Sequence, residues 1–122
     1  MQIFLVEDSG PVRARLSEML GAIPGATLVG SAANADDAIR EILCLRPQVV
    51  VLDLSLAGGS SGFDVLRTVR NAAPEIEFYM LSNFSADPYR QLAERLGARD
   101  FFDKTKEFER VRDVITTRAA VN

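Results

Sequence analysis

The sequence contains no histidine, and this absence removes several kinds of chemistry at once. Without histidine there is no Ser-His-Asp or Cys-His nucleophile system, and no metal site that depends on imidazole. Any reaction must therefore use carboxylates, hydroxyls or lysine. The single cysteine, Cys44, cannot form an internal disulfide, and its apolar neighbours Ile42, Leu43 and Leu45 predict a small core residue rather than a reactive thiol. This pattern is typical of a reducing cytoplasm.

Long hydrophobic runs and clusters of positive charge are also missing. No apolar stretch approaches the roughly 18 to 20 residues needed to cross a bilayer, and the N-terminus has neither a basic region nor a small-residue cleavage site. We therefore expect a soluble, unexported, cytoplasmic protein. The net charge is −3 and the 14 Lys and Arg residues are scattered, so we expect no direct binding of nucleic acid. Because an apolar span is missing, we also expect no association with a membrane.

What the chain does contain is ordinary globular composition. It has 122 residues, of which 48% are hydrophobic and 25% charged. This length is close to that of one domain with one core. We find no repeat, linker or low-complexity tail, and we expect residues 1–122 to form a single domain.

Short apolar runs alternate with longer amphipathic segments from end to end, which is the rhythm of repeated βα units. The apolar runs are "QIFLV", "ATLVG", "QVVVL", "EFYML" and "RDFF". Helix starts are indicated at Ser9 to Pro11, Asn34 and Asp87-Pro88, and helix ends at Gly21, Gly97, Pro24, Pro47 and Pro74. Five such units fit a chain of this length.

The run from Val49 to Leu52 does not alternate with polar residues. Both faces of this strand should therefore be covered, as in a parallel sheet between two layers of helices. Because crossover connections are right-handed, few layouts remain. The sequence predicts an α/β fold with a doubly wound, five-stranded parallel sheet in the order 2-1-3-4-5 and five helices.

Polar side chains stand where the predicted strands end. The first strand ends in Glu7-Asp8, the third in Asp53, the fourth in Ser82 and the fifth in Asp103-Lys104. Parallel strands end at one edge, and ligands bind there beside the point where strand order reverses. We therefore expect three acids to converge in one crevice, with a hydroxyl and an ammonium group on its other side.

Clustered carboxylates repel one another, so ionising all of them is unfavourable unless a cation is present. All-oxygen ligation by few protein groups suits Mg²⁺, which commonly shares its ligands with a phosphoryl group. Lys104 and Ser82 would then face the phosphoryl oxygens. The apolar run before Asp53 would hold that acid rigidly at the rim.

The motifs "FLVEDS", "VVVLDL", "YMLSN" and "GARDFFDK" together resemble the receiver domain of bacterial two-component response regulators, from Gln2 to about Thr117. The resemblance implies a flavodoxin-like fold that accepts a phosphoryl group on an aspartate from a histidine kinase or phosphotransfer protein. The implied output is a downstream protein target, an effector domain or a homodimer. Such a domain is a signalling switch that catalyses only its own phosphorylation and dephosphorylation.

The resemblance also implies a role for each matching residue. The implied set is the acidic pair Glu7 and Asp8, the phosphoacceptor Asp53, Ser55 as a carbonyl ligand of Mg²⁺, the switch hydroxyl Ser82, the aromatic switch Phe101 and the lysine Lys104. The output surface of the family corresponds to the segments 87–96 and 106–118.

The sequence departs from the family pattern at several positions. Thr105 stands where proline is usual after the lysine, so a trans peptide bond is expected there. Ala57 also replaces a common proline, and Gly62 lies nine residues after Asp53, one more than usual, which predicts a longer and looser loop. We also expect Asn83 to cover part of the phosphoryl site and change the rate of water attack. Because Phe101 lacks a tyrosine hydroxyl, its switching must depend on packing.

Other interpretations remain open. Taken singly, Glu7-Asp8 and Asp53 could be turn residues, Ser82 a plain loop serine and Lys104 a solvated lysine. Their joint occurrence in order at the strand ends favours a site. A Mg²⁺-dependent phosphate ester hydrolase is a second hypothesis, although hydrolases of the haloacid-dehalogenase type carry an acid where Ser55 stands. A third is an interaction module with a vestigial, unphosphorylated site.

Overall fold

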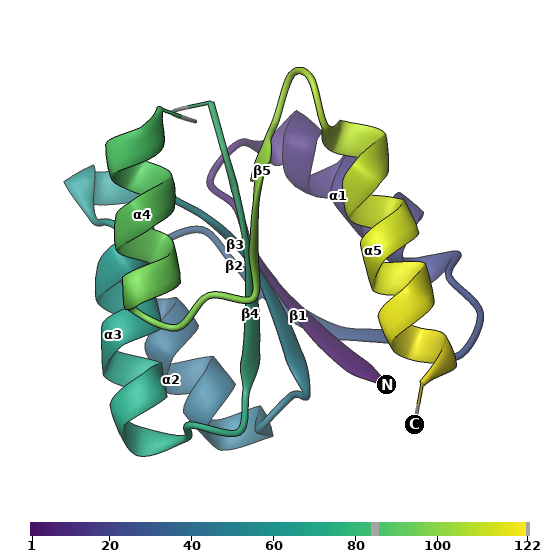
Figure 1. The fold of residues 1–122 in the computed structure, drawn as a ribbon. Coiled ribbons are helices and arrows are strands. Elements are labelled where there is room, and N and C mark those ends of the chain that lie inside the picture. Colours follow the sequence, from purple (N-terminus) through teal and green to yellow (C-terminus); the bar gives the residue numbers. More distant parts are fainter. Residues whose placement is uncertain (84–85, 122) are drawn as a thin grey trace.

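The computed structural model describes residues 1–83 and 86–121, which form one sheet with helices on both faces (Figure 1). The elements in chain order are β1 (Gln2–Val6), α1 (Gly10–Gly21), β2 (Thr27–Ala32), α2 (Ala35–Leu45), β3 (Val49–Asp53), the 3₁₀ turn η1 (Ala57–Gly59), α3 (Gly62–Ala72), β4 (Glu77–Ser82), α4 (Asp87–Arg95), β5 (Asp100–Asp103) and α5 (Phe108–Ala120). The predicted alternation of strands and helices is confirmed.

All paired strands are parallel, and their order is β2-β1-β3-β4-β5. The predicted order is therefore confirmed. In the register of the sheet, Val6 pairs with Leu52, and Ser82 pairs with Asp103. The strands consequently finish together, and the residues that follow them gather at one edge, which we call the carboxyl edge.

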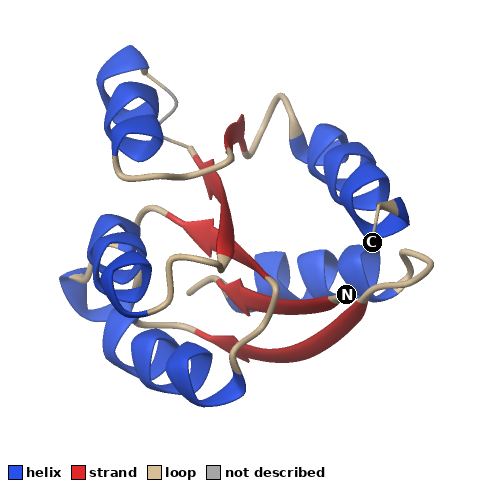
Figure 2. Cartoon of the chain, turned by 60° about the horizontal axis from the view of Figure 1, so that its bottom comes forward, coloured by secondary structure: helices blue, strands red, loops and turns tan. Residues whose placement is uncertain are grey.

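Both faces of the sheet are covered, as the apolar run of β3 predicts. Every residue of β3 is buried. Figures 1 and 2 show α2, α3 and α4 on one face and α1 and α5 on the other. The strands β1, β3, β4 and β5 therefore send alternate side chains into two separate cores. In β5 the two aromatic residues divide in this way, with Phe101 in one core and Phe102 in the other.

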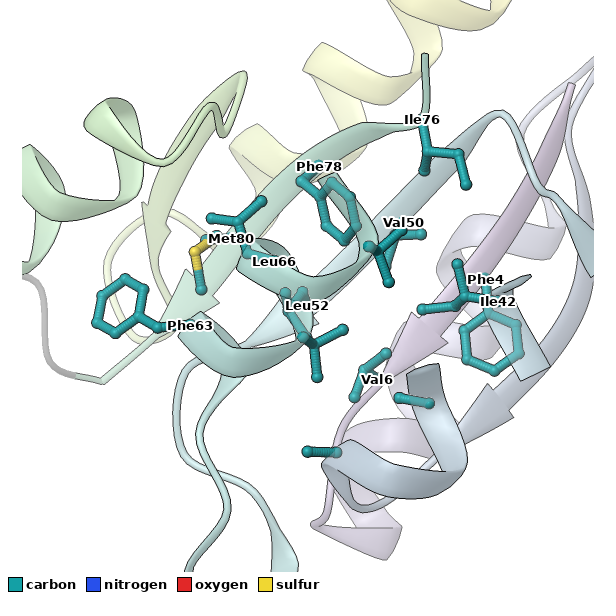
Figure 3. Packing of buried hydrophobic residues seen from close by; sticks show 14 of the residues in the cluster. Phe4, Val6, Ile42, Val50, Leu52, Phe63, Leu66, Ile76, Phe78 and Met80 are labelled. Carbon is teal, nitrogen blue, oxygen red and sulfur yellow. The ribbon is translucent and has the colours of Figure 1, made fainter. Parts of the chain in front are cut away.

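The larger core lies between the sheet and α2, α3 and α4. Figure 3 shows Val50 and Leu52 of β3 beside Phe78 and Met80 of β4, with Leu66 of α3 packed over them. All five of these side chains are fully buried. Their interlocking fixes the strands relative to one another, so the carboxyl edge rests on a closely packed support.

The helix termini use the residues that the sequence indicates. Ser9 and Asn34 occupy the N-cap positions of α1 and α2, and each side chain accepts a hydrogen bond from a backbone N–H in the first turn. The helix α4 begins at Asp87, as predicted, although the cap position belongs to Ala86, which offers no side-chain acceptor. Gly97 follows α4 with φ of 99°, a left-handed conformation that favours glycine.

Cys44 corrects one expectation. The sequence predicted a small core residue, but the thiol is exposed. The reason is helical geometry, because a residue two positions after the buried Ile42 lies on the far side of α2.

None of the helices within the described part of the chain is long and apolar enough to span a bilayer.

Candidate functional site

A pocket opens at the carboxyl edge, beside the point where β1 and β3 lie next to each other and the strand order reverses. Its lining consists of Glu7, Asp8, Ser9, Val12, Arg15, Asp53, Ser55, Ser82, Asn83, Lys104, Thr105 and Phe108. The loops after β1, β3, β4 and β5 all contribute. The structure thus brings six of the seven sequence-predicted site residues to one pocket; the seventh, Phe101, lies elsewhere. Their chemical roles stay predictions.

Three carboxylates form the acidic part of the pocket. One oxygen from each of Glu7, Asp8 and Asp53 lies within 4.8 Å of the others. Glu7 is fully buried and Asp53 is 5% exposed, whereas Asp8 is exposed. Such a set of oxygen donors, open on one side, fits a hard divalent cation of the size of Mg²⁺.

Lys104 lies across from the acids and contacts two of them. Its Nζ is 2.6 Å from Oε1 of Glu7 and 2.8 Å from Oδ2 of Asp53. The contact with Asp53 is a hydrogen bond. Oε1 of Glu7 is close enough for an ion pair but has no well-aligned hydrogen bond, which marks it as the less satisfied oxygen. One ammonium group therefore compensates two buried negative charges.

Burial and charge change the proton affinities of this cluster. Burial is the main cause that raises the pKa of Glu7 to about 6, and the charge of Asp53 adds to it, while Lys104 and the backbone N–H of Ser9 oppose it. Burial lowers the pKa of Lys104, but its contacts with Asp53 and Glu7 outweigh that effect, so the pKa lies above its usual value. The ammonium group therefore remains charged.

A turn after β5 positions Lys104 without the usual proline. The peptide bond between Lys104 and Thr105 is trans, as expected. The backbone N–H of Lys104 donates to the carbonyl of Ser82 at 3.0 Å. Oδ1 of Asp103 accepts from the N–H groups of Thr105 and Lys106 at 2.8 and 2.9 Å. These hydrogen bonds close the turn and direct the lysine over the carboxyl edge.

The loop after Asp53 is held by hydrogen bonds, which corrects the expectation of a loose loop; its greater length relative to the family stays a prediction. Gly62 N–H donates to the carbonyl of Leu54 at 2.7 Å, and Ser55 and Ser61 form an antiparallel bridge. A Cβ at Gly62 would overlap the backbone oxygen of Asp53. The chain returns so closely to Asp53 at this point that only glycine fits.

The same loop is attached to the start of α2. Oγ of Ser60 accepts from the N–H of Ala35 at 3.2 Å and donates to the carbonyl of Ala57 at 2.8 Å. Ala57 N–H in turn donates to the carbonyl of Ala33 at 3.0 Å. The hydrogen bonds of Ala57 and Ser60 therefore attach the loop that carries Ser55 to the start of α2.

The two residues at the end of β4 differ in exposure. Ser82 is fully buried, and Asn83 is exposed at the pocket. Ser55 is exposed as well, and its N–H lies 3.4 Å from Oδ1 of Asp53. The position of Asn83 agrees with the expectation that its amide borders the site, while its effect on any reaction stays a prediction.

Phe101 is the sequence-predicted residue that does not reach the pocket. It is 5% exposed and belongs to the core beneath α4. The guanidinium group of Arg90 lies 5.2 Å from the centroid of its ring and donates to its carbonyl at 2.8 Å. Arg90 also donates to Oε1 of Glu107 at 2.9 Å, so α4, β5 and the start of α5 are joined around this aromatic ring.

Sequence reasoning missed the residues that α1 and α5 add to the pocket. Val12, Arg15 and Phe108 were not among the predicted site residues, yet all three border the pocket. The available signal was the helical period, because Arg15 lies one turn after Val12 and seven residues after Asp8. A single sequence does not reveal which side of the first turn faces the acids.

The sequence and fold have counterparts in known proteins. The sequence model of the response regulator receiver domain matches residues 3–116. The DNA-binding transcriptional activator DevR/DosR of Mycobacterium tuberculosis is 32% identical over 87 residues, which cover 71% of this chain and 40% of that protein. A protein-glutamate methylesterase/protein-glutamine glutaminase of Carboxydothermus hydrogenoformans is 31% identical over 112 residues, 90% of this chain and 32% of that protein. The chain thus spans well under half the length of both relatives.

Solved structures agree. A LuxR-family two-component response regulator from an Aurantimonas species superposes with a TM-score of 0.89 at 25% identity, covering 98% of this chain and 84% of that one. The response regulator domain of Thermotoga maritima CheB gives a TM-score of 0.87 over 98% of this chain and 93% of that chain. At 23% identity the second likeness concerns the fold alone.

Proposed function

This chain belongs to the family of response regulator receiver domains of two-component systems, and we propose that its Asp53 accepts a phosphoryl group in a Mg²⁺-dependent reaction. We propose that residues 1–122 act as one such domain in the cytoplasm. The observation that carries the proposal is the position of Asp53, which is nearly buried, has Glu7 and Asp8 beside it, and contacts the ammonium group of Lys104 at 2.8 Å.

The residues of the pocket support this chemistry in distinct ways. A carboxylate oxygen of Asp53 would attack phosphorus in line while the loop closed by Gly62 keeps it in position. Lys104, already 2.8 Å from Asp53, would bind an oxygen of the arriving phosphoryl group. The hydroxyl of Ser82 would bind another.

Glu7, Asp8, Asp53 and the carbonyl of Ser55 are the groups that would hold the cation. Bound Mg²⁺ would neutralise the negative charge that otherwise keeps an anionic donor away from an anionic nucleophile. Phosphoryl transfer depends mostly on positioning and electrostatics, so one nucleophile and a few charged groups suffice.

The proposed output is a change of conformation in the segment after β4 and in the neighbouring surface of α4 and β5. A phosphoryl group that draws Ser82 and Lys104 inward would favour one arrangement of the segment after β4. Phe101, joined to α4 through Arg90, would transmit the change by packing. We propose a histidine kinase or phosphotransfer protein as the donor, and a protein target, an effector domain or a second copy of the chain as the recipient of the signal.

A direct test uses intact mass after incubation with Mg²⁺ and acetyl phosphate or phosphoramidate. We expect one phosphoryl adduct, no adduct in EDTA and none in Asp53→Asn. Asp64→Asn is the matched control, because it removes an exposed carboxylate on α3 outside the pocket and should still react. An adduct that persists in Asp53→Asn contradicts the proposal.

The same measurement separates the two alternatives. Continuous release of phosphate from a range of phosphate esters favours a hydrolase. Ser55 argues against that outcome, because it stands where such a hydrolase carries its general acid. Absence of both an adduct and Mg²⁺ binding favours a vestigial interaction module. In the proposed function the chain is a switch rather than an enzyme acting on other substrates.

A further inference from the structure

Arg15 stands at the rim of the pocket and is held there by an aromatic ring. It comes from α1, and its guanidinium carbon lies 3.9 Å from the centroid of the Phe108 ring at the start of α5. Both residues line the same pocket as Asp53. Stacking fixes the plane of the guanidinium group while leaving its N–H donors at the edges of that plane available.

The donors of Arg15 are not used within the described ranges 1–83 and 86–121, where its one polar or ring contact is with Phe108. Its neighbour Arg13 differs, because its Nη1 donates to the carbonyl of Glu7. Lys104 differs too, since it contacts Glu7 and Asp53. Arg15 is therefore the cation of the pocket that can bind an anion without giving up a protein partner.

The position of Arg15 determines which part of a donor it can meet. Asp53 is nearly buried at the bottom of the pocket, whereas Arg15 is exposed at its rim. In-line attack by Asp53 places the leaving group on the side of phosphorus opposite the attacking oxygen, which is the side of the pocket mouth. Lys104 is positioned for the phosphoryl oxygens, and Arg15 for the group that departs.

We propose that Arg15 is a specificity-determining residue that binds the leaving group of the phosphoryl donor and favours donors whose leaving group is a carboxylate. The inference rests on the proposed function, because it concerns the donor that reacts with Asp53. A planar guanidinium group matches the two oxygens of a carboxylate, and the match improves as negative charge develops on them.

Two small donors separate this effect from general attraction of phosphate. With acetyl phosphate, an oxygen of Asp53 forms the new bond to phosphorus, the bond from phosphorus to the acetyl oxygen breaks, and its electron pair departs on acetate. With phosphoramidate, the same bond forms, the bond from phosphorus to the protonated nitrogen breaks, and its electron pair departs on neutral ammonia. Only the first reaction delivers an anion to the rim.

The first experiment compares rates of Asp53 phosphorylation by the two donors in saturating Mg²⁺. We expect Arg15→Gln to lower the rate with acetyl phosphate relative to phosphoramidate by about three- to tenfold, a range set by a charge-assisted pair at an exposed position. Arg67→Gln makes the same change of net charge on α3, outside the pocket, and should leave the ratio unchanged. An unchanged ratio in Arg15→Gln overturns the inference while the adduct itself upholds the proposed function.

A second experiment measures binding without reaction. Phosphonoacetate carries a phosphonate and a carboxylate, whereas methylphosphonate lacks the carboxylate. In excess Mg²⁺ we expect the wild-type chain to prefer phosphonoacetate by about three- to tenfold, with a shift of the Arg15 Nε–H resonance, and Arg15→Gln to lose the preference. Equal preference in the two proteins overturns the inference, even if no donor phosphorylates Asp53.

The role of the aromatic ring is tested in the same assays. Phe108→Leu keeps an apolar side chain beneath Arg15 but removes the flat surface on which it stacks. We expect this variant, and Arg15→Lys, to retain only part of the acetyl phosphate preference, because the charge remains while its orientation is lost. Full retention in both variants contradicts an oriented contact with the leaving group.

Discussion

Two glutamates at opposite edges of the sheet show how differently the fold treats the same side chain. Glu7 follows β1 at the carboxyl edge, is fully buried, and has Lys104 as its cation. Glu77 begins β4 at the other edge and accepts three hydrogen bonds from the guanidinium group of Arg118 at 2.7 to 3.0 Å. Tyr79 donates a fourth at 3.3 Å.

The proton affinities of the two carboxyl groups follow from these surroundings. Burial dominates at Glu7 and raises its pKa to about 6, since its cation is shared with Asp53. At Glu77 the hydrogen bonds from Arg118 outweigh burial, so the pKa lies below its usual value. The edge where β4 begins, which we call the amino edge, thus stabilises its carboxylate fully, whereas the carboxyl edge keeps negative charge that protein groups compensate only in part. A cation and a phosphoryl group can use this uncompensated charge.

If backbone packing rather than charge pairing stabilises the carboxyl edge, substitution of Gly62 should cause the largest loss in the free energy of unfolding. Gly62→Ala should lower the free energy of unfolding by about 2 to 4 kcal/mol, because its Cβ would overlap the backbone oxygen of Asp53. Urea denaturation measures the change.

Gly10→Ala is the matched control for Gly62→Ala. Gly10 is likewise the first residue of a helix, but nothing lies within 4 Å of the position that a Cβ would occupy there. The control should be nearly neutral or slightly stabilising. Similar losses in the two variants would contradict the close approach at Gly62.

The fold could be predicted from local pattern because its signals are local. The unbroken apolar run of β3 predicted a strand covered on both faces. Ser9 and Asn34 indicated helix starts that the structure confirms. Cys44 shows the limit, since neighbours in sequence do not say which side of a helix faces the core. The ordered loop after Asp53 shows another, because its hydrogen bonds join residues brought together only by folding.

The site could be predicted in part for a similar reason. Residues at strand ends are placed together by sheet topology, so the acids, Ser82 and Lys104 were found from the sequence. The contribution of Arg15 and Phe108 depends on how α1 and α5 pack against each other, and their cation–π contact joins elements far apart in the chain. Sharing of Lys104 between two acids is likewise visible only in three dimensions.

The amino edge should show the next largest effect. Glu77→Gln should lower the free energy of unfolding by about 1 to 2 kcal/mol at pH 7, because Arg118 loses a charged partner but can still reach water. Because the pKa of Glu77 is lower in the folded chain than the usual 4.5, its stabilisation is present above pH 4.5 and is lost as the pH falls through the folded value.

The gap between wild type and Glu77→Gln should therefore narrow below pH 4.5. Urea denaturation of both proteins over a pH series gives the gap directly. Glu75→Gln is a suitable control, since its carboxylate is 67% exposed in its pair with Arg46 and should contribute little at any pH. A gap that stays constant through the acid range would mean that Arg118 does not hold the ionised form of Glu77.

Glu7→Gln should give the smallest change and the sharpest contrast. In EDTA at pH 7 the variant should be within about 1 kcal/mol of wild type, or slightly more stable, because the amide avoids burying an ionised group and Lys104 keeps its contact with Asp53. Glu18→Gln, an exposed position on α1, controls for the change in net charge. A loss as large as that of Glu77→Gln would mean that Glu7 stabilises the fold through its ion pair. The carboxylates at the two edges of the sheet would then both act in stability, despite their different geometry.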